Sequence, residues 1–302
     1  MKLRAGPTGV HFFSRTTGLN VLCEEVRTPP SSWATAPRQV SIALTNRCDL
    51  SCAYCYAPKN RSRLDYSQLT SWLSEFDANG CLGVGFGGGE PTLYQNFVPL
   101  CHHVATNTGL AVTFTTHAHR VDHQLVDALK GCIHFVRVSI DGIGSTYERM
   151  RGRSFVALRS RLDLVRTLAP LGINFVVNSV TITDLDGAIH LASEIGATEL
   201  LLLPERGING RSGIDAITRA ALSKWIHAYS GAIPLCISEL DADASVYPIF
   251  TAEKGLRAYA HIDASGCLKR SSFDIDGRQI GSDGVISTLL ELKKQLGEED
   301  VA

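Results

Sequence analysis

The sequence predicts an α/β fold with a parallel sheet, because apolar runs and amphipathic helical patterns alternate along it. After a first strand over Gln39–Thr45, further strands are expected at Leu82–Phe86, Leu110–Thr115, Ile133–Ile140, Ile173–Val180, Glu199–Leu203 and Ile233–Ile237. Continuous apolar runs are typical of parallel strands buried on both faces. Apolar residues at helical spacing predict helices at Ser67–Phe76, Ser154–Leu168, Leu185–Ile195 and Ile214–Tyr229. This alternation indicates right-handed strand–helix–strand crossovers.

The composition is that of an ordinary globular protein, with 302 residues, 44% hydrophobic and 20% charged. A net charge of −1 gives no overall electrostatic reason to expect a nucleic-acid or anionic-membrane partner. No apolar run approaches the roughly twenty residues needed to span a bilayer, and the amino terminus lacks the apolar core of a signal peptide. Nine cysteines without an export signal indicate a reducing compartment, so we expect the cytoplasm.

The first 37 residues predict a hairpin followed by a linker. The runs Gly9–Phe13 and Asn20–Glu25 flank Thr16-Thr17-Gly18-Leu19, and residues 28–37 are rich in proline and serine. This segment is shorter than an independent domain of the usual fifty or more residues. We expect a hairpin that covers one edge of the main sheet.

Three cysteines follow the first strand within eight residues, at Cys48, Cys52 and Cys55. Thiolates this close repel one another and need a cation, and as soft ligands they select zinc, copper(I) or iron–sulfur. A structural zinc site requires a fourth ligand, and the next cysteine, Cys81, stands beyond a predicted helix. Three thiolates suit a [4Fe–4S] cluster that leaves one iron open.

Further candidate residues lie at the ends of four other predicted strands. Gly87-Gly88-Gly89-Glu90-Pro91-Thr92 follows the second strand, and Ser139 and Asp141 end the fourth. Asn178 ends the fifth strand and Leu203 the sixth. Function collects at the carboxyl ends of strands in a parallel barrel, so these residues should converge on one mouth. Gly88 and Gly89 would let the backbone approach a ligand closely.

The three motifs together resemble the radical S-adenosylmethionine (SAM) superfamily: the C-x3-C-x2-C spacing with an aromatic before the third cysteine, the "GGEP" motif, and the strand ending in Ser139. This resemblance implies a partial (β/α)6 TIM-like barrel over residues 38–237. It implies a [4Fe–4S] cluster held by Cys48, Cys52 and Cys55, with SAM on the open iron.

The resemblance also assigns contacts to SAM. Tyr54 is expected along the adenine, and Glu90, with the Gly88 and Gly89 backbone, at the amino group. Ser139 and Asp141 are expected at the ribose. Asn178 and the Leu203 backbone are further candidates, and Arg151 is a candidate for the SAM carboxylate or a substrate anion, with a surface salt bridge as its alternative.

The third strand departs from the family pattern, which often reads Thr-Asn-Gly at its end. Here it reads Thr115-Thr116-His117-Ala118-His119. His117 and His119 are therefore candidates for substrate contact or proton transfer near neutral pH. The alternative is a pair of solvated or structurally hydrogen-bonded histidines.

Residues 238–302 resemble the start of a SPASM or Twitch extension, which binds auxiliary clusters in relatives. Only Cys267 stands at a plausible ligand position there, so a cluster-free, truncated cap is expected. A lone thiol on a mouth-facing hairpin is a candidate hydrogen-atom donor to a substrate radical. The alternative for Cys267 is a small buried hydrophobe.

The resemblance thus implies an enzyme that reductively cleaves SAM and abstracts hydrogen from a substrate. The motif set favours a ribosomally synthesised peptide, with cross-linking or epimerisation as the modification. The alternative substrate is a small metabolite such as a sugar, nucleotide or amino acid. A third reading is a zinc- or cluster-binding protein without turnover. A reductase such as flavodoxin or ferredoxin is the expected protein partner.

Overall fold

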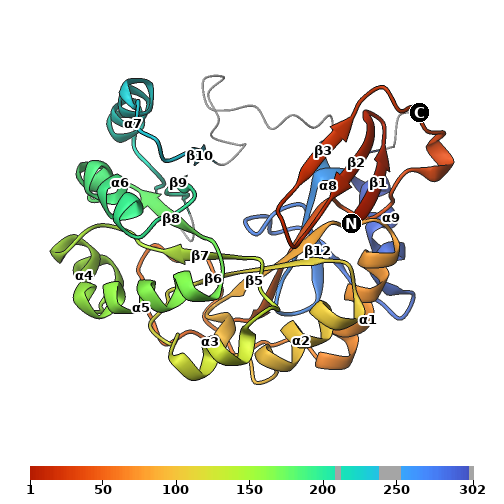
Figure 1. The fold of residues 1–302 in the computed structure, drawn as a ribbon, viewed down its shortest axis with the longest axis horizontal. Helices are drawn as coiled ribbons and strands as arrows, with labels where there is room; N and C mark the ends of the chain where they lie inside the picture. Colours follow the sequence, from red (N-terminus) through yellow and green to blue (C-terminus); the bar gives the residue numbers. More distant parts are fainter. Residues whose placement is uncertain (208–211, 238–252, 299–302) are drawn as a thin grey trace.

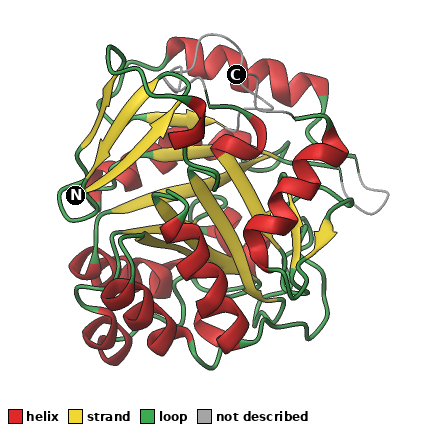
Figure 2. Ribbon diagram, turned by 90° about the vertical axis from the view of Figure 1, so that its right-hand side faces the viewer, coloured by secondary structure: helices red, strands yellow, loops and turns green. Residues whose placement is uncertain are grey.

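The computed structural model describes residues 1–207, 212–237 and 253–298, so residues 238–252 of the expected cap lie outside the described part. Its main sheet has ten strands in the order β10-β9-β8-β7-β6-β5-β4-β11-β12-β13. Strands β4 to β10 and β11 pair in parallel, while β12 and β13 are antiparallel. Helices surround the strands of this curved sheet (Figure 2).

The strands of the main sheet are β4 (Gln39–Thr45), β5 (Gly83–Gly88), β6 (Ala111–Thr116), β7 (Phe135–Ser139), β8 (Leu171–Val177), β9 (Leu200–Pro204), β10 (Leu235–Ile237), β11 (Tyr259–Ile262), β12 (Cys267–Lys269) and β13 (Arg278–Gln279). The helices are α1 (Tyr66–Ala78), α2 (Phe97–Asn107), α3 (His123–Leu129), α4 (Ser145–Arg151), α5 (Phe155–Leu168), α6 (Leu185–Glu194), α7 (Ala216–Ala228), α8 (Gly255–Ala258) and α9 (Gly284–Leu296). Among the described residues no helix is both long and apolar enough to cross a bilayer.

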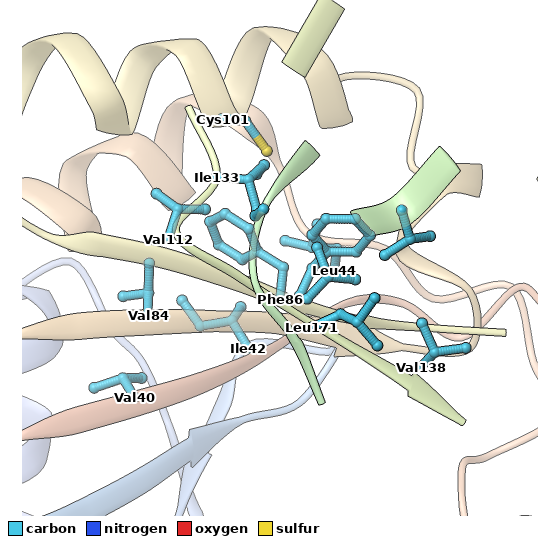
Figure 3. Packing of buried hydrophobic residues seen from close by; sticks show 14 of the residues in the cluster. Val40, Ile42, Leu44, Val84, Phe86, Cys101, Val112, Ile133, Val138 and Leu171 are labelled. Carbon is cyan, nitrogen blue, oxygen red and sulfur yellow. The ribbon is translucent and has the colours of Figure 1, made fainter. Parts of the chain in front are cut away.

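The core lies between the outer face of the sheet and these helices. Alternate residues of β4, namely Val40, Ile42 and Leu44, are fully buried there, and Figure 3 shows them beside Val84 and Phe86 of β5. Successive side chains of a strand point to opposite faces. The remaining β4 residues, including Ser41, therefore line the inner face of the barrel, where the chemistry is expected.

The helices begin where the sequence provides caps and apolar periodicity. The Asp65 carboxylate accepts the backbone N–H groups of Ser67 and Gln68 at the start of α1, and the Ser154 hydroxyl accepts that of Ala157 at the start of α5. The α1 residues Leu69, Trp72, Leu73 and Phe76 form its buried face. All seven predicted strands and all four predicted helices are present, with ends that differ by a few residues.

The C-terminal region differs from an appended cap. The predicted hairpin is present as β11 and β12, but β11 also pairs in parallel with β4, with Tyr259 opposite Gln39. The described residues after 252 thus extend the barrel sheet past its first predicted strand. The bond between Ser41 Oγ and His261 Nδ1, 2.8 Å long, joins the two strands on the inner face.

The N-terminal hairpin is larger than expected and lies elsewhere. Strands β1 (Lys2–Gly6), β2 (Gly9–Phe13) and β3 (Asn20–Cys23) form a separate antiparallel sheet (red in Figure 1). Arg15 Nη1 donates to the carbonyl groups of Thr108 and Leu110, just before β6 begins. The expectation that the hairpin covers a sheet edge is therefore wrong: it lies against the amino ends of the barrel strands.

A buried ion pair stabilises the end of the barrel where the strands begin, which we call the base of the barrel. The Arg4 and Glu253 side chains are 1% and 5% exposed, with 2.7 Å between Arg4 Nη2 and Glu253 Oε1. The guanidinium also donates to the carbonyl groups of Ala36, Gly80 and Arg257. The Arg4 side chain thus connects β1 to three other segments, at Ala36, at Gly80 and at residues 253–257.

We expect Arg4→Met to lower the free energy of unfolding by about 3 kcal/mol, because the buried Glu253 carboxylate loses its closer partner and keeps only Arg38, 3.7 Å away. Urea denaturation followed by circular dichroism measures this. The control Arg166→Met removes an exposed arginine of α5 and should change stability by about 0.5 kcal/mol or less. Equal effects of the two substitutions would show that Arg4 is not needed for the base.

Candidate active site

The predicted site residues come together at the carboxyl end of the barrel. Strands β4, β5, β6 and β7 run parallel and end at Thr45, Gly88, Thr116 and Ser139. Each is followed by a segment that carries candidate residues. The segment after β4, residues 46–63, holds the three cysteines and is called the cysteine loop below.

Cys48, Cys52 and Cys55 are free thiols, and each is half-buried. The backbone N–H of Leu50 donates to Cys48 Sγ at 3.4 Å, and burial raises the pKa of the Cys48 thiol. Arg151 Nη1 lies 3.8 Å from Cys52 Sγ. Backbone N–H groups and a guanidinium are the donors that stabilise sulfur ligands of a cluster.

The glycines before Glu90 are required by the cysteine loop itself. A Cβ on Gly89 would lie 2.2 Å from the carbonyl oxygen of Arg47, and one on Gly88 would lie 2.3 Å from that of Thr45. The Gly89 N–H donates to Thr45 O at 2.7 Å, and the Glu90 N–H donates to Arg47 O at 2.8 Å. Gly88 and Gly89 were expected to let a ligand come close to the backbone. In this structure it is the backbone of Thr45 and Arg47 that comes close to them.

The Glu90 carboxylate is buried and surrounded by donors from the chain. Thr92 donates to Oε1 through its backbone N–H and its hydroxyl, and the Thr116 hydroxyl lies 2.9 and 3.0 Å from the two oxygens. The His117 N–H donates to Oε2 at 3.1 Å. Glu90 therefore joins the ends of β5 and β6. Thr116 was missed from the sequence, because nothing in the run Thr113–Thr116 distinguishes it.

His117 connects this junction to the cysteine loop. Its Nε2 lies 2.8 Å from Asp49 Oδ1 and 3.3 Å from Glu90 Oε2. Its Nδ1 accepts the backbone N–H of His119 at 3.1 Å, which assigns the ring proton to Nε2. The contacts of His117 in this structure are thus those of a structurally hydrogen-bonded histidine, which was the alternative to a role in substrate contact or proton transfer. Asp49, next to Cys48, was not singled out from the sequence.

Cys48, Asp49 and His117 also offer three ligand atoms within 4.8 Å of one another. In the tautomer assigned from the His119 contact, His117 Nε2 donates a hydrogen bond toward the Asp49 and Glu90 carboxylates instead of offering a lone pair to a metal ion. The network therefore favours a bracing role for His117 over metal ligation.

His119 follows His117 by two residues in the segment after β6. His119 Nε2 is 2.8 Å from the Tyr147 hydroxyl. The pKa of His119 is lowered to about 4, mainly by burial and to a smaller extent by the nearby His117. The ring is neutral at physiological pH. Between the two histidines Ala118 has φ +64°, a left-handed conformation that costs a residue with a Cβ about 1 kcal/mol.

A second network joins the cysteine loop to β7 and β8. The Asp141 carboxylate is fully buried; its Oδ2 accepts the Tyr54 hydroxyl at 2.6 Å and pairs with Arg151. Its Oδ1 accepts the Val176 N–H at 2.8 Å. The Arg151 guanidinium lies over the Tyr54 ring, 5.7 Å from the centroid. Tyr54, Asp141 and Arg151 thus contact one another, which the separate motifs did not predict.

The other predicted residues are spread along the mouth. Ser139 is half-buried at the end of β7, and Leu203 is half-buried in β9. Asn178 Nδ2 donates to Glu205 Oε2 at 2.7 Å, while its Oδ1 accepts the N–H groups of Val180 and Thr181. Beside Glu205 lies a cavity of about 330 Å³, whose wall includes Arg206, Arg219 and Phe273.

Cys267 begins β12 and is half-buried. It shares a face of β12 with Lys269, which pairs with His261, and His261 bonds Ser41 on the inner face of β4. The Cys267 thiol therefore belongs to the inner face. Burial and then Asp263 raise the pKa of this thiol, which is protonated at neutral pH.

These residues fit an iron–sulfur cluster with one open iron. The donor set is three half-buried thiols on one loop, as a cluster of this kind requires. Arg151 Nε, beside Cys52, is buried and has no hydrogen-bond partner among the described residues. A buried donor without an acceptor is costly, and an additional group bound at this position would supply one.

Gly89→Ala should displace the cysteine loop, destabilise the fold by about 2 kcal/mol through overpacking, and lose most of the iron after anaerobic reconstitution. Gly87→Ala is the matched control, because a Cβ there meets nothing within 4 Å. Iron analysis and thermal unfolding of both variants provide the test. Iron retention by Gly89→Ala equal to that of Gly87→Ala would contradict the assigned contact.

Comparison with known proteins matches part of the chain to a family model. Residues 42–188 match the model of the Radical SAM superfamily. A PqqA peptide cyclase from Rhodopseudomonas palustris is 33% identical over 150 residues, which are 48% of this chain and 39% of that protein. An Fe-coproporphyrin III synthase from Methanosarcina barkeri is 26% identical over 159 residues, which are 50% of this chain and 40% of that protein. The matched part of the chain thus spans about two fifths of the length of these relatives.

The fold agrees with this family. The crystal structure of Streptococcus suis SuiB bound to S-adenosylmethionine matches with a TM-score of 0.69 at 13% identity, over 92% of this chain and 84% of SuiB. This likeness confirms the predicted partial-barrel architecture. Together, the family match and the shared fold identify residues 42–188 as a radical SAM domain, of the superfamily that uses a [4Fe–4S] cluster and SAM.

Proposed function

We propose that the chain is a radical SAM enzyme that modifies a ribosomally synthesised peptide, by cross-linking or epimerisation. The observation that carries the proposal is the set of three half-buried thiols at the barrel mouth, braced through Asp49, His117 and Glu90. The peptide substrate is supported by the similarity to a PqqA peptide cyclase, a relative whose name specifies a peptide.

When bound, the cluster and SAM supply a 5′-deoxyadenosyl radical that abstracts hydrogen from a substrate. The chain's own contribution is to hold and shield these groups. Cys48, Cys52 and Cys55 hold the cluster, and the buried Arg151 guanidinium offsets negative charge at Cys52.

The SAM contacts in the proposal follow from the positions of the strand ends. Ser139 and the Leu203 backbone stand half-buried at the mouth, as contacts to the nucleoside require. The Glu90 carboxylate is the proposed acceptor for the amino group of SAM. This amino group would take the place of one of the two hydroxyl groups, of Thr92 and Thr116, that donate to Glu90 in this structure. Tyr54, Asp141 and Asn178 keep their assignments as SAM contacts, although each has protein partners in this structure.

The cavity beside Glu205 is the proposed position for part of the substrate. It lies between the end of β9 and Phe273, a residue of the segment that follows β12. We therefore propose that residues 38–237 form the radical SAM barrel. Of the expected cap, residues 238–302, the described residues 253–298 extend the barrel sheet and complete its substrate side. Residues 1–37 form the sheet and linker at the base.

The alternative substrate is a small metabolite. The second relative, an Fe-coproporphyrin III synthase, is named for a small-molecule product and favours this alternative. A short precursor gene next to this chain's gene would discriminate in favour of the peptide. We further propose a flavodoxin- or ferredoxin-type reductase as partner, no nucleic-acid partner, and the reducing cytoplasm as the location.

The enzyme reconstituted anaerobically should contain about four irons per chain and release 5′-deoxyadenosine when given dithionite and SAM. Cys52→Ala should lose both properties, because three thiolates are needed to hold the cluster. The control Cys23→Ala changes a cysteine of β3 and should keep both. A fully loaded wild-type sample that releases no 5′-deoxyadenosine would leave the protein as a cluster-binding protein without turnover.

If Cys267 donates a hydrogen atom to the substrate radical, Cys267→Ala should still cleave SAM but lose the modified product. Cys236→Ala in β10 is the matched control. Mass spectrometry of the precursor peptide and quantification of 5′-deoxyadenosine separate the two steps. Product formation at the wild-type level by Cys267→Ala would assign this thiol to packing alone.

A further inference from the structure

The cavity beside Glu205 lies where segments from the two ends of the main sheet meet at the mouth of the barrel. Arg206 follows β9, the second strand from one end of the sheet, and Phe273 follows β12, the second strand from the other end. The Arg206 guanidinium lies over the Phe273 ring, 4.7 Å from its centroid. The wall of the cavity therefore combines side chains from both ends of the sheet.

The Phe273 ring also contacts the cysteine loop. Its centroid lies 4.6 Å from that of Tyr56, the residue after Cys55, and the planes of the two rings are tilted by 49°. Tilted aromatic pairs at this separation are stabilising beyond the area that they bury. Phe273 and Tyr56 are 40% and 45% exposed, so both rings are accessible at the surface. A group bound against Arg206 and Phe273 is thus connected by one ring contact to the segment that carries the proposed cluster ligands.

The backbone after β9 brings a second arginine to the same wall. The Ile214 N–H donates to the carbonyl oxygen of Glu205 at 2.7 Å, which holds the segment before α7 against the end of β9. A Cβ on Gly213 would lie 2.7 Å from that same oxygen, so this close approach requires a glycine. Arg219, in the second turn of α7, thereby shares the cavity wall with Arg206.

The charged side chains on the wall favour a ligand with one negative charge. Among the described residues that line the cavity, Glu205 is the one carboxylate, and its Oε2 accepts Asn178 Nδ2 at 2.7 Å. Two guanidinium groups and one carboxylate leave a single formal positive charge. A phosphate monoester carries about two negative charges at neutral pH, whereas a carboxylate carries one. The planar fork of a guanidinium also matches the two oxygens of a carboxylate.

We propose that this cavity binds a carboxylate group of the substrate, which in a peptide is the side chain of an aspartate or glutamate residue. Arg206 and Arg219 are the residues that determine this specificity, and Phe273 orients Arg206. The inference rests on the proposed function and adds the kind of side chain that the substrate presents here. A volume of about 330 Å³ is at the lower end of the roughly 300–1,000 Å³ of ligand sites, which suits one residue of a longer peptide.

The test exposes the reconstituted full chain, with SAM and without oxygen, to a pool of short random peptides and sequences the captured peptides by mass spectrometry. Binding of glutarate, a small dicarboxylate, is measured separately by calorimetry. The variants are Arg206→Gln, Arg219→Gln and Arg206→Lys. Lys224→Gln is the matched control, because it removes an exposed cation from the same helix, α7. Iron content and circular dichroism establish that each variant is folded and loaded.

We expect the wild type to enrich aspartate and glutamate over asparagine and glutamine about tenfold at one peptide position, because the bond to a guanidinium is charge-assisted. Arg206→Gln and Arg219→Gln should each lose most of this enrichment. Arg206→Lys should keep part of it, because the charge remains but the planar fork does not. Lys224→Gln should equal the wild type. Dithionite-driven SAM cleavage should persist in every variant, because the cavity wall contains none of the proposed cluster ligands.

The outcomes separate this inference from the proposed function. Equal enrichment of acidic peptides by the wild type and both glutamine variants would overturn the carboxylate site, as would a wild type that neither enriches acidic peptides nor binds glutarate. Glutarate binding that the glutamine variants lose, without enrichment of acidic peptides, would support the carboxylate site and assign it to a small-molecule substrate. Absence of dithionite-driven SAM cleavage in the loaded wild type would contradict the proposed function itself, whatever the cavity binds.

Discussion

The contact between the backbones of Gly88–Gly89 and Thr45–Arg47 determines where the candidate site can form. It brings the end of β5 against the start of the cysteine loop, with two N–H···O bonds and no space for a Cβ. Glu90, which follows β5, then bonds the backbone of His117 at the end of β6. The His117 side chain in turn contacts Asp49 of the cysteine loop. The cysteine loop is therefore held before Cys48 by the backbone bonds to Thr45 and Arg47, and after Cys48 by the contact of His117 with Asp49.

The sequence predicted the barrel well, because its strands are continuous apolar runs and its helices have regular apolar spacing. It also predicted the cysteine loop, whose spacing is local. It did not predict that β11 pairs with β4, since the bond between Ser41 and His261 joins residues 220 positions apart. Nor did it predict the contact of Tyr54 with Asp141, because each residue was interpreted within its own motif.

The glycines show why a correct motif can have a second physical basis. From the sequence, Gly88 and Gly89 were explained by the approach of a ligand. In the structure the approaching atoms are the carbonyl oxygens of Thr45 and Arg47. A similar distinction applies to Asp141, whose buried oxygens organise Tyr54, Arg151 and β8. Such residues can shape a cofactor site by holding its walls, whatever else they contact.

The ion pair between Arg4 and Glu253 has a consequence for the order of events during synthesis. Arg4 leaves the ribosome some 250 positions before its carboxylate partner and the Arg257 carbonyl. Until then the guanidinium must stay hydrated, because an unpaired charge is costly to bury. The amino end of the barrel can therefore close only once Glu253 has emerged, which is after β4, the cysteine loop and β5.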